Sequence, residues 1–149
     1  MTSDGFTRDA NFVPITNLGL VASKAITYVA GTTGATGATT LFTVTGCVVV
    51  RVWGVCGLTL VGAATLEVGI VGGTATILAQ IGDATTLATD ELYLDATPTT
   101  KVEALPAALL IGNGQDIIQT IGSTAISAGS ITYYCAWTPL SADGNVVTA

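Results

Sequence analysis

The stretch CVVVRVWGVCGLTLVGAATLEVGIVGG, residues 47–73, carries only two charges, Arg51 and Glu67, and it decides between a membrane span and a soluble sheet. A membrane-spanning helix needs about 20 consecutive apolar residues. Residues 52–66, between the two charges, number only 15 and include five glycines or threonines. Glycine and β-branched residues are poor helix formers, whereas valine favours a pleated, half-buried strand. The stretch therefore predicts two strands of a soluble sheet.

Side chains of alternating character support this prediction. On the first strand, one face holds Cys47, Val49, Arg51 and Trp53, and the other face holds Val48, Val50, Val52 and Gly54. On the second strand, one face holds Leu66, Val68 and Ile70, and the other face holds Thr65, Glu67 and Gly69. This period of two is typical of a sheet with one buried face. The small residues of 57–64 predict the connection between the strands. Arg51 and Glu67 are then placed to pair across adjacent strands.

Seven further segments show short strand patterns with turn residues between them, which makes nine strands with the two above. They are KAITYVAG (24–31), TLFTVTG (40–46), TILAQIG (76–82), DELYLDA (90–96), TKVEAL (100–105), QDIIQTIG (115–122) and GSITYYCAWTPL (129–140). In the last segment Ile131, Tyr133, Cys135 and Trp137 share one face. NGQD (113–116) is typical of a hairpin turn. Pro98 and Pro106 argue against a helix in 96–110.

The strand pattern predicts an all-β fold with one domain, an antiparallel β-sandwich or a jelly-roll-like barrel, over residues 23–149. Residues 1–22 show no clean period and are expected to form an extended N-terminal arm. The tail SADGNVVTA (141–149) is expected to be a turn followed by a short exit.

The net charge of the chain restricts the classes of binding partner that we expect. The 149 residues carry a net charge of −6 and 9% charged residues, against about 25% in an ordinary domain. An acidic chain repels phosphate backbones and anionic lipid, so neither nucleic acid nor a membrane is an expected partner. The first residues, which include Asp4 and Asp9, have no apolar core and do not resemble a signal peptide.

Catalytic motifs are missing from the sequence. Without histidine, Ser-His and Cys-His nucleophiles and His-ligated metals are impossible. The glycine-rich residues 31–40 lack the lysine of a phosphate loop, and Glu67 and Glu103 are too scattered for a carboxylate pair. Cys47, Cys56 and Cys135 are best read as reduced thiols packed as small hydrophobes, and Trp53 and Trp137 as core anchors. We therefore expect no enzyme, and no catalytic, cofactor-binding or metal-binding residues.

Three carboxylates, Asp90, Glu91 and Asp95, lie close together in the sequence. Their spacing matches no EF-hand loop, so the simple interpretation is a solvated strand end. They would become Ca²⁺ ligands only if the chain were a carbohydrate-binding β-sandwich.

The segments ITYVAGTTGATGATTLFTVTG (26–46), VVVRVWGV (48–55), ELYLDATP (91–98) and YYCAWTPLSADGNVV (133–147) resemble small structural proteins of tailed bacteriophages, most of all the head decoration, or cement, proteins. The resemblance covers the chain from about Lys24 onward. It implies a trimer or other small homo-oligomer that binds the major coat protein on the outer capsid surface of the virion, after synthesis and assembly in the host cytoplasm.

The N-terminal arm is the segment that we expect to lie along coat or neighbouring decoration subunits, through Phe6, Arg8, Phe12 and Ile15. A disordered tail is the alternative for this segment. Two other functions stay open: a phage tail, fibre-base or head-completion structural protein, and the carbohydrate-binding β-sandwich.

Overall fold

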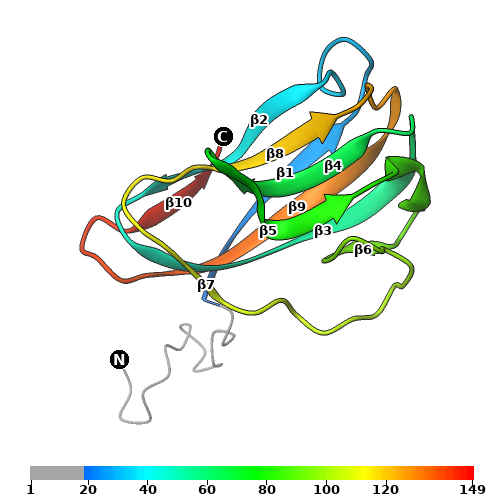
Figure 1. The fold of residues 1–149 in the computed structure, drawn as a ribbon. Helices are drawn as coiled ribbons and strands as arrows, with labels where there is room; N and C mark the ends of the chain where they lie inside the picture. The colour runs from blue at the N-terminus through cyan, green and yellow to red at the C-terminus, as the bar shows by residue number, and fades with distance from the viewer. Residues whose placement is uncertain (1–18) are drawn as a thin grey trace.

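In the computed structural model, which describes residues 19–149, two antiparallel sheets pack face to face (Figure 1). The first sheet has the order β1-β9-β3-β6, with β7 also paired to β3, and the second the order β10-β2-β8-β4-β5. The strands are β1 (Leu20–Thr27), β2 (Gly37–Thr45), β3 (Val48–Val61), β4 (Thr65–Ile70), β5 (Gly73–Ile81), β6 (Leu92–Tyr93), β7 (Leu109–Ile111), β8 (Ile117–Gly122), β9 (Ala128–Pro139) and β10 (Asn145–Thr148). The all-β prediction and the sandwich architecture are confirmed.

The described residues contain one helical element, the single 3-10 turn Ala84–Thr86. Within residues 19–149 the chain forms no helix with the length and apolar character that crossing a membrane requires.

Strand β3 confirms the alternation predicted for the opening stretch. Val48, Val50 and Val52 are fully buried, while Arg51 and Trp53 are half-buried on the opposite face. The strand continues for 14 residues through Val61, so the connection predicted over 57–64 shrinks to residues 62–64. The prediction failed there because β-bulges after Cys56 and Leu58 absorb the small residues without ending the strand.

The buried face predicted for the last strand is also confirmed. Strand β9 lies between β1 and β3, and its Ile131, Tyr133 and Cys135 are fully buried. Trp137 is 8% exposed, as a core anchor should be. Trp53 is not a core anchor, because it lies on the solvent side of the same sheet.

Strand β4 corrects two predictions. All four residues from Leu66 to Gly69 are buried, so the strand has no free face. Arg51 and Glu67 lie in different sheets and cannot pair, and the Glu67 carboxylate accepts a hydrogen bond from Gln80 Nε2 at 2.7 Å instead.

Residues 90–111 also depart from the sequence prediction. Only Leu92–Tyr93 of the segment 90–96 forms a strand, and 100–105 forms none. Residues 94–108, which we call the strap, make an irregular excursion from β6 to β7 with no helix (Figure 1). The strand β7 was not predicted, because LLI is too short to show a period.

Three further boundaries differ from the sequence prediction. Residues 113–116 form a turn, but it joins β7 in the first sheet to β8 in the second and is no hairpin. The tail forms strand β10, which pairs with β2. Strand β1 begins at Leu20, within the range assigned to the arm.

Candidate interaction surface

The carboxylates considered for metal binding or catalysis are not brought together. Asp90 pairs with Lys101 at 3.5 Å, Glu91 accepts the Ala88 N–H at 2.8 Å, and Asp95 accepts the Thr97 N–H at 2.7 Å. Within residues 19–149 no three His, Cys, Asp or Glu side chains form a group that could hold a metal ion. Glu103 lies exposed on the strap, whereas Glu67 is buried in β4 of the second sheet.

The three thiols are free, and two of them are fully buried. Burial raises the pKa of Cys135 to about 12. Burial, helped by the Glu91 carboxylate, raises the pKa of Cys56 to about 11. Both thiols are therefore protonated at neutral pH and are weak nucleophiles. They fit the predicted role of small hydrophobes, while Cys47 is half-buried.

A tyrosine cluster inside the sandwich provides the polar contacts of the core. The Tyr28 hydroxyl donates to Gln119 Oε1 at 2.9 Å and lies 3.4 Å from the Tyr133 hydroxyl. The Tyr93 hydroxyl lies 2.9 Å from the carbonyl oxygens of both Leu66 and Ala79, which links the two sheets. Burial raises the pKa of all three tyrosines. These groups are closed off from solvent and act in folding.

The outer face of the first sheet is the part of the molecule that remains open. Outward side chains of β1, β9, β3 and β7 lie side by side in register, and the rows are Leu110, Val49 and Thr138, then Arg51, Ala136 and Val21, then Trp53, Tyr134 and Ser23. Trp53 and Tyr134 stack with ring centroids 5.7 Å apart and an angle of 15° between the planes. Leu110 is 66% exposed and Val21 53%. The face is apolar apart from Arg51 and a few hydroxyls.

The strap extends this apolar surface beyond the sheet. Every residue from Lys101 to Leu110 is exposed except Pro106, which is half-buried. Val102 is 87% exposed, the highest value among the large hydrophobic residues described. Irregular loops longer than about 12–15 residues are uncommon in compact domains and are usually functional. We call the strap and the outer face of the first sheet together the docking surface.

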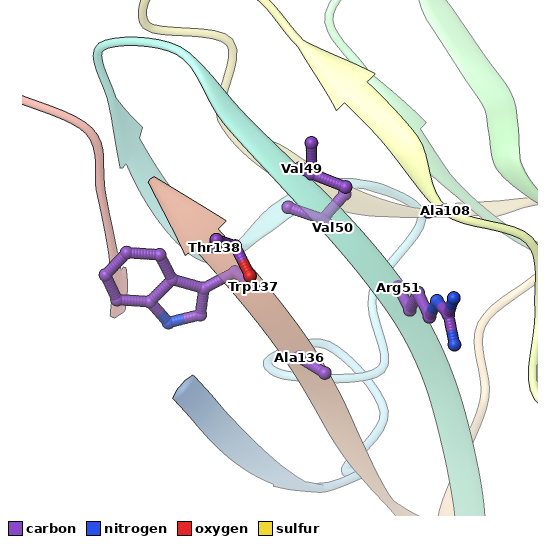
Figure 2. Close-up of a pocket in the computed structure, with 7 residues that line it drawn as sticks. All are labelled: Val49, Val50, Arg51, Ala108, Ala136, Trp137 and Thr138. Atoms are coloured by element: carbon purple, nitrogen blue, oxygen red, sulfur yellow. The ribbon is translucent and has the colours of Figure 1, made fainter. Parts of the chain in front are cut away.

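A pocket of about 100 Å³ opens where the strap meets the sheet (Figure 2). It is lined by Val49, Val50, Arg51, Ala108, Ala136, Trp137 and Thr138. Figure 2 shows the Arg51 side chain and the Trp137 ring extending in opposite directions, so that the ring belongs to the core and the guanidinium to the open face.

A second hollow, of about 260 Å³, lies on the other side of β7. It joins Leu109, Leu110 and Ile111 to Ile70 and Ile77 of the second sheet. Ala108 thus lines the first depression and the adjoining β7 lines the second, and both depressions are largely apolar. Neither depression was predicted, because both depend on strands distant in sequence meeting at one edge.

The predicted interaction residues Phe6, Arg8, Phe12 and Ile15 lie outside the described residues, which begin at Gly19. Comparison with known proteins adds no relative: no family model, no curated protein and no solved structure matches this chain.

Proposed function

We propose that this chain is a non-enzymatic structural protein of a tailed-phage virion that binds the outside of the capsid and stabilises the coat lattice. The observation that carries the proposal is the docking surface, an apolar sheet face continuous with an exposed strap that presents Val102 and Leu105. Protein interfaces concentrate apolar and aromatic groups with Arg at their centre and are depleted in Lys, Glu and Asp. The sheet face has this composition, with Trp53, Tyr134, Leu110 and Arg51 near its middle. The strap adds Val102 and Leu105 and carries three exposed charges at its surface.

The partners proposed are the phage major coat protein and further copies of the same chain, in a trimer or other small homo-oligomer. Binding is by surface area and shape, because the described residues offer neither a metal group nor an activated nucleophile. Exposed apolar patches larger than a few hundred Å² are rare on monomers and mark interaction sites. The location proposed, from the resemblance to decoration proteins, is the outer capsid surface.

Co-sedimentation with purified coat shells of the source phage tests this proposal. We expect saturable binding to expanded shells at a copy number near that of the coat protein, and none to unexpanded shells. Leu110→Asp and Val102→Asp should abolish binding, because a carboxylate is desolvated at the contact. Val71→Asp is the matched control, since Val71 is 74% exposed in the turn between β4 and β5 of the second sheet and lies outside the docking surface. Absence of binding to either shell would refute capsid decoration.

A tail, fibre-base or head-completion role predicts binding to the virion at a few copies per particle, with no binding to isolated coat shells. Counting copies in purified virions separates the two locations.

The stacked pair Trp53 and Tyr134 favours one other candidate, a carbohydrate-binding sandwich, because aromatic rings on a flat sheet can hold sugar rings. Glycan binding that quenches Trp53 fluorescence and is lost in Tyr134→Ala, with no binding to shells, would favour this candidate. The Asp90, Glu91 and Asp95 carboxylates are engaged in local contacts, so binding of this kind would not depend on Ca²⁺.

A further inference from the structure

Arg51 differs from the other basic residues that the structure describes. Lys24 Nζ donates to the Ala149 carbonyl oxygen, and Lys101 pairs with Asp90. Within residues 19–149 no carboxylate lies within 4.0 Å of the Arg51 guanidinium, and no hydrogen bond joins it to another side chain. Arg51 is therefore the cation of the described chain that remains available to a partner.

The surroundings of Arg51 determine what it can bind. Val49, Ala108 and Ala136 line the pocket beside it, and the stacked Trp53 and Tyr134 lie one row further along the sheet. A half-buried guanidinium forms short, bidentate hydrogen bonds with a carboxylate, and a dry apolar rim strengthens them. The matching ligand is a peptide segment with one carboxylate between apolar side chains.

The described chain begins at the rim of this pocket. A Cβ atom added to Gly19 would lie 2.7 Å from Thr138 Oγ1 and 2.4 Å from the Trp137 carbonyl oxygen, and both residues line the pocket. The φ of Gly19 is +84°, a conformation that favours glycine. Eighteen residues precede this point in the sequence, and fully extended they would span up to about 60 Å.

The sequence of these 18 residues has the composition that the pocket requires. Asp9 stands midway between Phe6 and Phe12, three residues from each, and Ile15 follows three residues later. Asp4, the other carboxylate, has serine and glycine as neighbours and only one phenylalanine, Phe6, within three residues.

The direction of β1 argues for exchange between copies. The strand starts at Leu20, level with Trp137 at the end of β9, and runs toward Thr27. Continuing its line backward leads past Thr138 and off the end of the sheet, and the pocket lies beside this point, so a segment that continues in this direction would leave the pocket of its own copy behind. Ten residues separate Asp9 from Gly19, and a pocket on a neighbouring copy is in reach up to about 33 Å away.

We propose that residues 1–18 of one copy dock on the docking surface of a second copy, with the Asp9 carboxylate on the Arg51 guanidinium and Phe6 and Phe12 on the apolar rim. This inference deepens the proposed function, since it names the contact that holds the homo-oligomer together. It is tested on the isolated protein without coat shells, so its failure is distinguishable from failure of shell binding.

The experiment is sedimentation equilibrium of the full-length chain over a wide concentration range. We expect the wild type to self-associate, and Arg51→Glu and Asp9→Lys each to weaken association at least about tenfold, because each places two like charges against each other at the contact. The double variant carrying both changes should recover most of the loss, which a folding defect would not do.

Two matched controls complete the experiment. Lys24→Glu makes the same charge change as Arg51→Glu at a residue on the opposite face of β1 from Val21 and Ser23, outside the docking surface. Asp4→Lys makes the same change as Asp9→Lys elsewhere in the segment. Both should associate as the wild type does. A monomeric wild type overturns the proposal, and so does equal weakening by Asp4→Lys and Asp9→Lys. The alternative is docking of the segment within one chain. It would appear as a change of Trp53 fluorescence in Arg51→Glu at protein concentrations where the wild type is monomeric. This result would also overturn the proposal.

Discussion

The outward side chains of the two sheets differ in how far they are exposed to solvent. On the first sheet the outward residues include Val21, Val49 and Leu110, which are half-buried or exposed. On the second sheet the outward positions include Ile118 and Glu67, which are 6% and 9% exposed. The difference shows that the second sheet is covered by its own chain at β4 and β8, whereas the first sheet is left open along β1, β3 and β7.

The start of β5 provides the cover on the second sheet. A Cβ atom added to Gly69 would meet the Gly73 carbonyl oxygen at 2.0 Å and the Thr74 backbone at 2.6 Å. Register shifts along β5 bend it out of the regular ladder, and the Gln80 amide closes over the Glu67 carboxylate. No comparable segment of residues 19–149 lies over Trp53 and Tyr134, so this pair remains half-buried.

The largest expected loss in the free energy of unfolding comes from a substitution on the buried side of the first sheet. Trp137→Ala should lower the free energy of unfolding by about 3–5 kcal/mol, because it leaves a cavity beside the core. Trp53→Ala, on the outer side, should cost about 1 kcal/mol, since the ring stack is worth roughly 0.5–1.5 kcal/mol. Urea unfolding measures both variants. Equal losses would mean that the outer side is as closely packed as the core.

Gly69→Ala tests whether the second face is covered. The added methyl group would clash with backbone atoms of Gly73 and Thr74, and overpacking of this kind costs about 1–3 kcal/mol. Gly82→Ala is the control, because no atom lies within 4 Å of its Cβ position. Thermal unfolding of the two variants at one pH makes the comparison. If Gly69→Ala unfolds at the same temperature as the wild type, the start of β5 can shift away from β4 at little cost in stability.

A pH series probes the thiols on the interior side. Free cysteine has a pKa of about 8.5, whereas that of Cys135 is raised to about 12. Above about pH 8.5 the unfolded chain releases a proton that the folded chain retains, so stability should be level below that pH and fall above it. Unfolding in urea between pH 7 and pH 10 measures the decline. Cys135→Ala should make the decline of stability with pH shallower. An unchanged slope would contradict the raised pKa of Cys135.

Leu110→Thr should have the smallest effect on folding. Leu110 is 66% exposed and threonine suits a strand, so the free energy of unfolding should change by no more than about 0.5 kcal/mol. Urea unfolding measures it. A loss as large as that of a core residue would mean that the outer face of the first sheet is already covered in the isolated chain.

The local sequence pattern correctly predicted the strands that have one solvent-exposed face and one buried face. The valines of β3 and the alternation from Ile131 to Trp137 in β9 were read correctly, because a period of two follows from strand geometry. Strand β4 was misread, since what covers its outer side is the start of β5 folding over it. The short strands β7 and β10 were missed, because three or four residues show no period and depend on pairing with β3 and β2.

The amino-acid sequence by itself determined the all-β class, the absence of histidine chemistry and the scarcity of charge, because these depend on composition and on alternation along single strands. Only the tertiary structure decided which charges and apolar groups meet. Arg51 and Glu67 belong to different sheets, and the docking surface joins β1, β9, β3 and the strap across more than 100 residues of sequence. The physical reason is that strand pairing is long-range, so sheet order follows from the packing of the whole core.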